Sequence, residues 1–234
     1  MNTENQFFAL LRSGLWEQTV NSSDFSKNTD WHTIYRIAQK QTVIGIVYDG
    51  LSKLPVELQP EQKLLYHWYS QVIKIEQANQ LLNSVLIDIY ELYQQNGIAP
   101  VLLKGQGIAQ CYINPLRRQC GDIDLYLDKD YNKANKLLQT KGLLNKDAIE
   151  TYKHLNFKYK GVTIENHRHI SHLYKKKYNC NLNKIISDWY PSNVRYQEIN
   201  GKNIALPPIR FDVLYIFLHL RNHFFEGGTG LRQL

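Results

Sequence analysis

Gly121-Asp122-Ile123-Asp124-Leu125-Tyr126-Leu127 is a largely apolar stretch that carries two aspartates two positions apart. Because side chains alternate between the faces of a β-strand, Asp122 and Asp124 project together, and the apolar side chains between and after them point the other way into a core. Two adjacent carboxylates repel each other and lose hydration, so the pair is costly without a cation. Oxygen ligands of this kind suit Mg²⁺ or Mn²⁺ bound together with substrate phosphates. The stretch therefore predicts a metal-dependent phosphoryl- or nucleotidyl-transfer site.

The same stretch has a simpler interpretation, in which the two acids are solvated at the end of a strand. An EF-hand calcium loop is excluded. Counting from Asp122, the sixth residue is Leu127 where glycine is needed, and the twelfth is Lys133 where glutamate is needed. A glycosyltransferase that uses a D-x-D pair to bind Mn²⁺ and a sugar nucleotide is a further alternative, but it would lack the phosphate turn and the third acid described next.

A predicted anion-binding turn precedes the aspartates. Residues 98–103 are an apolar run that predicts a buried strand, and residues 108–112 predict a short helix. Between them lies the turn Lys104-Gly105-Gln106-Gly107, where backbone N–H groups at a helix N-terminus can bind phosphate. Arg117 and Arg118 follow, and they form either a solvated basic turn or a clamp for a triphosphate. The order of strand, turn and helix favours a nucleotide-binding site.

A third acid would be needed to hold two metal ions. Residues 162–167 follow a Lys-Gly turn and predict a strand, with Thr163, Glu165 and His167 on one face. Glu165 is predicted to complete a cluster of three carboxylates and to help remove the proton of an attacking hydroxyl. The alternative is an exposed glutamate on an edge strand. His167 shares the face and is predicted to contact the nucleotide or to support the metal.

These motifs together resemble a known group of enzymes. The matching residues are Lys104-Gly105, Arg118 four positions before Asp122, the stretch from Gly121 to Leu127, and Glu165-x-His167. The pattern is similar to the nucleotidyltransferase superfamily of DNA polymerase β. Within it, the closest match is a family of uncharacterised bacterial nucleotidyltransferases with an LLKG … R..GDIDLLV … E-L-H pattern. The similarity covers about residues 98 to 170. In this chain Gln106 follows Gly105 where the superfamily prefers serine or glycine, and Asn166 stands where most members have an apolar residue.

The resemblance implies a minimal, polymerase β-like nucleotidyltransferase fold, an α/β (α+β) core with a small mixed sheet flanked by helical regions. It also implies transfer of a nucleoside monophosphate from an NTP to an acceptor hydroxyl, with release of pyrophosphate. Mg²⁺ or Mn²⁺, as two ions, would be the cofactor. By the same resemblance Asp122 and Asp124 would hold both ions, and Glu165 would hold the ion near the nucleophile. A nucleotide-binding or antitoxin-like module that has lost turnover is the remaining alternative.

The predicted organisation has three sections. Residues 1–97 are predicted to be helical and to end in one long helix over 61–95, which Asn96-Gly97 terminates. Residues 98–206 are predicted to form the nucleotidyltransferase core and to include a β-hairpin with an Asn200-Gly201 turn. Residues 207–234 predict the start of a C-terminal helical region, and the abrupt end of the chain predicts that further helices are missing from it.

Composition fits this interpretation. The net charge of +7 and the pI near 9.1 favour phosphate-bearing ligands. The densest basic patch is Lys175-Lys176-Lys177, but no RNA-binding signature accompanies it, so nucleic acid is a possible partner that the sequence does not indicate. The sequence contains no membrane-length apolar run, and its first residues show neither the basic nor the apolar segment that is typical of a signal peptide. Its three scattered cysteines fit a reducing compartment. The chain is therefore predicted to be cytoplasmic, with an NTP and an unidentified acceptor as its partners.

Histidines offer two further hypotheses. His167, His169 and His172 would form a zinc site only if the backbone bent between the last two. His219 and His223 lie four positions apart on a predicted helix, but the glutamate of an H-E-x-x-H motif is replaced by Leu220. An ordinary pair of histidines on one helix face is the favoured interpretation of the second set.

Overall fold

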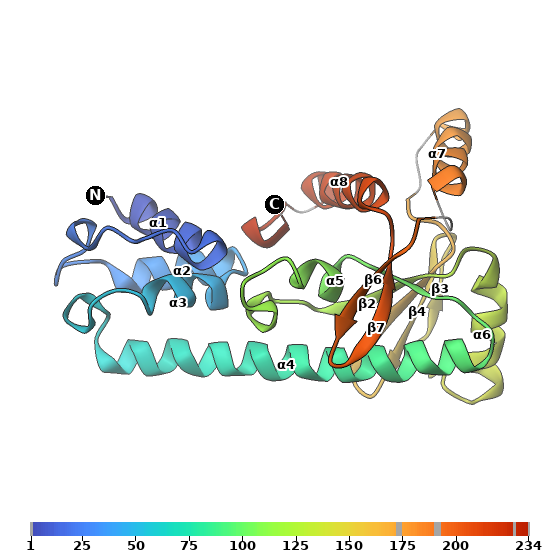
Figure 1. Cartoon of the computed structure of the whole chain (residues 1–234), viewed down its shortest axis with the longest axis horizontal. Coiled ribbons are helices and arrows are strands. Elements are labelled where there is room, and N and C mark those ends of the chain that lie inside the picture. The colour runs from blue at the N-terminus through green and yellow to red at the C-terminus, as the bar shows by residue number, and fades with distance from the viewer. Residues whose placement is uncertain (1, 172–174, 190–192, 227, 234) are drawn as a thin grey trace. The chain divides into compact units, whose positions relative to one another are not determined.

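The computed structural model describes residues 2–171, 175–189, 193–226 and 228–233, which form two compact units (Figure 1). The first unit contains residues 2–80, 109–119 and 228–233. The second contains residues 81–108, 120–171, 175–189 and 193–226. The chain leaves the first unit within the long helix α4 (Gln62–Gln95), so this helix contributes to both. The long helix predicted over residues 61–95 is thus confirmed.

The first unit is helical among its described residues. Its elements are α1 (Thr3–Trp16), η1 (Ser22–Asp24), α2 (Trp31–Lys40), α3 (Ile44–Leu51), η2 (Val56–Leu58), the first part of α4, η3 (Pro115–Arg117) and η5 (Leu231–Gln233). Its core includes Trp68, which is fully buried and donates its indole Nε1–H to the carbonyl oxygen of Ile44 at 3.1 Å. Glycine allows α1 and α3 to approach closely, because a Cβ added at Gly14 would lie 1.9 Å from the carbonyl oxygen of Ile46.

The close approach of α1 and α3 leads to a prediction about the stability of a variant at Gly14. Gly14→Ala should destabilise the first unit by about 1–3 kcal/mol, because the methyl group would overlap backbone atoms that a side-chain rotation cannot move. Gly121→Ala is the matched control, since a Cβ there meets nothing within 4 Å. Thermal unfolding should show a midpoint several degrees lower for the first variant than for the second. Equal midpoints would contradict the tight packing of α1 on α3.

The second unit contains the sheet. Its elements are the rest of α4, β1 (Val101–Leu103), α5 (Gly105–Ala109), β2 (Asp122–Tyr126), η4 (Asp128–Asp130), α6 (Tyr131–Thr140), β3 (Ile149–Glu150), β4 (His154–Tyr159), β5 (Val162–His167), α7 (Lys176–Trp189), β6 (Arg195–Ile199), β7 (Lys202–Leu206) and α8 (Ile209–Glu226). Five strands form one sheet in the order β1-β2-β5-β4-β3, in which only β2 and β5 pair in parallel. Strands β6 and β7 form a separate hairpin. The predicted α+β fold with a small mixed sheet is confirmed.

The two faces of the sheet have different neighbours. Ile123 and Leu125 of β2 are buried in the same hydrophobic core as residues of α4, such as Ile89. On the opposite face of β2, the ring of Tyr126 lies 5.8 Å from that of Phe211 on α8. Helix α4 therefore packs against the apolar face, while α8 lies by the face that carries the carboxylates, as Figure 1 also shows for this unit.

Two-residue turns connect the hairpins where the sequence predicted them. Lys160 and Gly161 join β4 to β5 with φ values of 49° and 81°. Asn200 and Gly201 join β6 to β7 with values of 47° and 79°. Positive φ at both central residues is the requirement of a type I′ turn, whose twist matches that of the paired strands.

The short helix predicted over residues 108–112 is wrong in its position. Helix α5 instead begins at Gly105 and ends at Ala109. The chain turns within two residues, since Lys104 and Gly105 both have positive φ (40° and 43°). The carbonyl oxygen of Lys104 then accepts the N–H of Gly107 at 2.9 Å, which starts the helix earlier. The observed helix has the same length as the predicted one, but it begins three residues earlier, directly at the turn.

Candidate metal and nucleotide site

Three carboxylates meet on one face of the sheet. The parallel register of β2 and β5 places Asp124 opposite Glu165, and Asp122 lies two residues before Asp124 on the same face. One oxygen atom from each of the three carboxylates lies within 4.8 Å of the other two. Asp124 is the most buried, with 1% of its side chain exposed, whereas Asp122 and Glu165 are partly exposed. The pattern of alternating side chains in the sequence therefore predicted the carboxylate face correctly.

The donor set fits a divalent cation. Mg²⁺ and Mn²⁺ are bound by carboxylate oxygens, and three such groups from two adjacent strands converge here. Burying several carboxylates together without a cation is unfavourable. Burial and the neighbouring Asp124 charge raise the pKa of Asp122 accordingly. Asp122, Asp124 and Glu165 are thus able to hold such an ion.

Lys104 supplies a positive charge within this cluster. Its Nζ atom lies 3.0 Å from Oδ2 of Asp124 and 3.5 Å from Oδ2 of Asp122, and 14% of its side chain is exposed. Burial alone would lower the pKa of Lys104, but the two aspartates outweigh burial and raise it. Burial would likewise raise the pKa of Asp124, whereas Lys104 and His167 lower it to about 2. The predicted phosphate-turn lysine therefore contacts the carboxylates directly.

His167 supplies the second contact to these carboxylates. Its Nε2 atom lies 2.9 Å from Oδ1 of Asp124 and 3.2 Å from Oε2 of Glu165. Burial favours the neutral imidazole, but hydrogen bonds to the two carboxylates outweigh it and raise the pKa of His167. The same contact changes the pKa of Glu165. Burial alone would raise this pKa, but the hydrogen bond with His167 outweighs burial and lowers it. His167 thus links the carboxylates of β2 and β5.

The remaining residues that the sequence predicted to bind the nucleotide, which are those of the turn after Lys104 and Arg118, lie in different parts of the structure. A Cβ added at Gly105 would lie 3.5 Å from the carbonyl oxygen of Asp122, so this glycine borders the carboxylate strand. Gln106 is buried, and Gly107 packs so closely that an added Cβ would lie 2.7 Å from the side chain of Leu206. Arg118 belongs to the first unit, where it is buried and its guanidinium lies 5.9 Å from the centre of the Tyr112 ring.

Residues of α8 that the motif analysis did not assign lie near the carboxylates. Tyr215 is buried, and its ring centre lies 6.5 Å from that of His167. The ring centre of His219 lies 6.1 Å from that of Tyr215, and the ring centre of His223 lies 4.4 Å from that of His219. Burial and the Lys104 ammonium lower the pKa of His219 to about 4, so His219 is neutral at neutral pH. The spacing of residues 211, 215 and 219 on one helix face was the signal that could have added Tyr215 to the two histidines named from the sequence.

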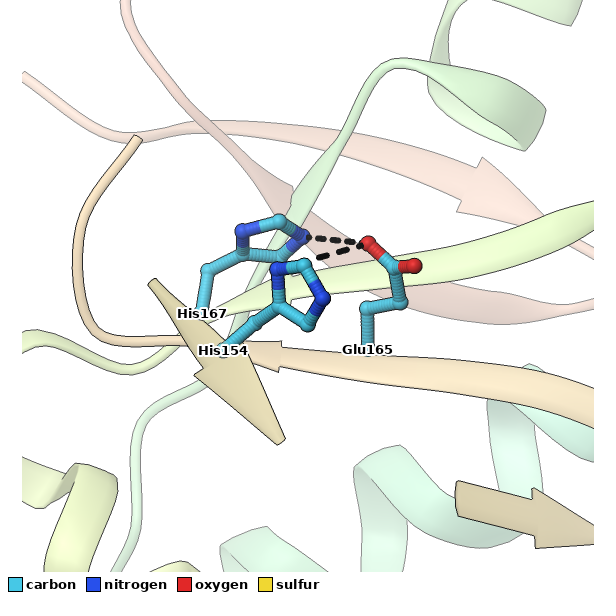
Figure 2. A group of neighbouring side chains, drawn as sticks. All are labelled: His154, Glu165 and His167. Carbon is cyan, nitrogen blue, oxygen red and sulfur yellow. Dashed lines mark ion pairs between the residues drawn. The ribbon is translucent and has the colours of Figure 1, made fainter. Parts of the chain in front are cut away.

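His154 was also missed by the motif analysis. It lies opposite His167 in the antiparallel register of β4 and β5, and its Nδ1 atom is 3.9 Å from Oε2 of Glu165. Figure 2 shows His154, Glu165 and His167 gathered around this oxygen. Counting outward from the Lys160-Gly161 turn pairs residues 154 and 167, so the hairpin itself contained the signal.

Comparison with known proteins agrees with this geometry. The model of an uncharacterised nucleotidyltransferase family matches residues 27–234, which include both aspartates, Glu165, Lys104 and His167. The chain belongs to this family. The family suggested by the LLKG, GDIDL and glutamate-strand motifs is therefore confirmed, and nucleotidyl transfer is supported as the general kind of reaction. Searches of curated proteins and of solved structures gave no match. In the described part of this family member, no helix is both long and apolar enough to span a membrane.

Proposed function

We propose that this family member transfers a nucleoside monophosphate from an NTP to an acceptor hydroxyl in a reaction that depends on Mg²⁺ or Mn²⁺. The observation that carries the proposal is the convergence of Asp122, Asp124 and Glu165, whose oxygens lie within 4.8 Å of one another on one sheet face. Family membership supports the reaction class. The three carboxylates would hold one or two divalent ions, which when bound supply neutralisation of phosphate charge and activation of the attacking hydroxyl.

The side chains have separate tasks in the proposed reaction. The acceptor oxygen forms a bond to the α-phosphorus, while the bond from that phosphorus to the bridging oxygen breaks and pyrophosphate leaves. Glu165 is partly exposed and accepts the hydrogen bond, and then the proton, of the acceptor hydroxyl. Lys104 presents its ammonium between both aspartates, where it can neutralise oxygens of the departing pyrophosphate.

His167 and Asn156 position the reacting carboxylates. His167 holds Asp124 and Glu165 through Nε2, and the Asn156 amide donates to Oε1 of Glu165 at 3.3 Å. Such contacts fix the orientation of the carboxylates before the substrate arrives, which reduces the reorganisation required during the reaction. The proposal therefore relies on positioning and charge, and no covalent enzyme intermediate is needed.

Calorimetric titration tests the proposal. ATP, GTP, CTP, UTP and UDP-glucose would be added to the protein with Mg²⁺, with Mn²⁺ or with no divalent ion. We expect at least one NTP to bind only in the presence of a metal, and the double variant Asp122→Asn/Asp124→Asn to bind it at least about 100-fold more weakly. Asp88→Asn is the control, since Asp88 forms an ion pair with Lys160 away from this face.

Each outcome of the titration has a distinct meaning. Equal NTP binding by the double variant would overturn the assignment of the aspartates. A preference for UDP-glucose over every NTP would favour glycosyl transfer instead. Metal-dependent binding without any release of pyrophosphate, in the presence of a broad set of alcohols, sugars and RNA, would favour a binding module that lacks turnover.

A further inference from the structure

A second set of possible metal ligands lies beside the carboxylate cluster, and its donors are mainly nitrogen. His154 and His167 are directly opposite each other on β4 and β5, and Glu165 precedes His167 by two residues on the same face. Donor atoms from the three side chains all lie within 4.8 Å of one another. Figure 2 shows both imidazole rings turned toward the same carboxylate. Pairing in the hairpin, rather than chance proximity of loops, therefore creates this set.

The distances suit a tetrahedral transition-metal ion. Ligands about 2.1 Å from a tetrahedral Zn²⁺ are separated from each other by roughly 3.4 Å. Oε2 of Glu165 lies 3.2 Å from Nε2 of His167 and 3.9 Å from Nδ1 of His154, values on either side of that separation. A shift of a few tenths of an ångström at each histidine would bring its nitrogen to this separation from Oε2.

The surroundings also favour an ion at this position. Nδ1 of His154 is buried and has no hydrogen-bond partner, although it is the atom closest to the carboxylate of Glu165. A buried ring nitrogen without a partner is unfavourable, and coordination of a cation would satisfy it. Asn156 donates to Oε1 of Glu165, which orients Oε2 toward the histidines. One oxygen of the glutamate is thus fixed by protein while the other is directed at the two rings.

We propose that His154, Glu165 and His167 form a binding site for Zn²⁺ that is chemically distinct from the three-carboxylate set. Two imidazoles and one carboxylate suit Zn²⁺ and leave a fourth position open, whereas Mg²⁺ prefers oxygen ligands alone. Because Glu165 belongs to both sets, an ion at the histidine site would compete with the carboxylate set for this ligand. The Zn²⁺ site requires only the three side chains and does not depend on nucleotidyl transfer.

The experiment measures metal binding directly. Metal-free protein would be titrated with Zn²⁺ by calorimetry, and with Co²⁺ as a spectroscopic probe whose visible absorption intensifies in tetrahedral coordination. We expect one equivalent of Zn²⁺ to bind, and His154→Gln to weaken binding at least about 100-fold, since loss of a ligand should exceed the effect of losing an outer contact. The Co²⁺ spectrum of that variant should lose its intense bands.

Two control variants distinguish this site from its neighbours. Asp122→Asn removes a carboxylate that only the oxygen set uses, and it should change the affinity for Zn²⁺ by less than about threefold. His169→Gln should have equally little effect, because the ring of His169 stacks on Tyr152 at 4.8 Å and is not a member of the cluster. This second control also tests the zinc hypothesis of His167, His169 and His172, of which His172 lies outside the described residues.

Three results would overturn the proposal. One is undiminished Zn²⁺ binding by His154→Gln, provided that circular dichroism shows the variant to be folded. A second is loss of Zn²⁺ binding in Asp122→Asn, which would assign the ion to the carboxylates. The third is the absence of Zn²⁺ binding by the unaltered protein. None of these results depends on NTP, so failure here and failure of the proposed reaction remain distinguishable.

Discussion

Lys104→Met is expected to destabilise the second unit by about 3 kcal/mol in the absence of divalent ions. The variant retains the apolar stem of the lysine and removes the ammonium that lies 3.0 Å from Oδ2 of Asp124. Asp124 has 1% of its side chain exposed, so solvent cannot replace the lost charge. His167 still contacts Asp124 in the variant. The expected decrease in the free energy of unfolding is therefore near the lower limit of the values found when a buried ion pair is broken. Urea denaturation of both proteins in a chelator would measure the difference.

Divalent ions should partly reverse this loss. In the unaltered protein Mg²⁺ must compete with the Lys104 ammonium for Asp122 and Asp124, whereas in Lys104→Met it meets no such competitor. Mg²⁺ should therefore stabilise the variant more than the unaltered protein, because an ion that binds only the folded state stabilises it in proportion to its affinity. Lys160→Met is the control, since the Lys160–Asp88 pair is exposed and should contribute at most about 1 kcal/mol. Similar stabilities for the two lysine variants would refute this role of Lys104.

Glu165→Gln is expected to separate binding from turnover. The amide retains the shape of the side chain but cannot take the proton of an acceptor hydroxyl, a loss that typically reduces the rate about 10²–10⁴-fold. Asp122 and Asp124 remain to hold the metal, so affinity for the NTP should change much less than the rate. The rate of pyrophosphate release, with water as the acceptor of the nucleoside monophosphate, would be compared with the calorimetric affinity for the NTP. The comparison would test whether the variant loses turnover while it retains binding.

A second glutamate variant makes that comparison specific. Glu91→Gln removes a charge that forms a partly exposed pair with Lys202 at 2.9 Å, and neither residue belongs to the carboxylate cluster. Its rate of pyrophosphate release should equal that of the unaltered protein. If Glu165→Gln also releases pyrophosphate at the original rate, Glu165 does not act as the proposed base.

Local patterns in the sequence predicted much of the candidate site. The alternation of Asp122, Ile123 and Asp124 assigned the aspartates to one face, and the Lys160-Gly161 turn located β5 and Glu165. These signals are local because alternation and turn type depend on neighbouring residues. The parallel pairing of β2 with β5 was not readable in this way, since the paired residues are about 40 positions apart and no turn fixes their register.

The features of the site that the sequence did not predict also depend on contacts between residues that are far apart in the chain. The start of α5 was missed because Lys104, a non-glycine residue, adopts positive φ, which is uncommon and depends on the surrounding structure. The contact of Lys104 with both aspartates requires β1 and β2 to be adjacent, and the approach of Tyr215 requires α8 to lie by the same face. These facts belong to the tertiary fold and not to any single motif.

The sequence of strand β5 favours a single register of this strand in the sheet. Asn166 is fully buried and bonds to the hydroxyl of Tyr93 on α4, while its neighbours Glu165 and His167 face the opposite side. A slip of one residue would direct both ionisable side chains at the apolar core and would expose the amide instead. Such a misaligned state would bury charge without partners, so its free energy lies far above that of the native pairing. The three consecutive residues thereby bias the chain, as it folds, toward the one strand alignment that brings the carboxylates together.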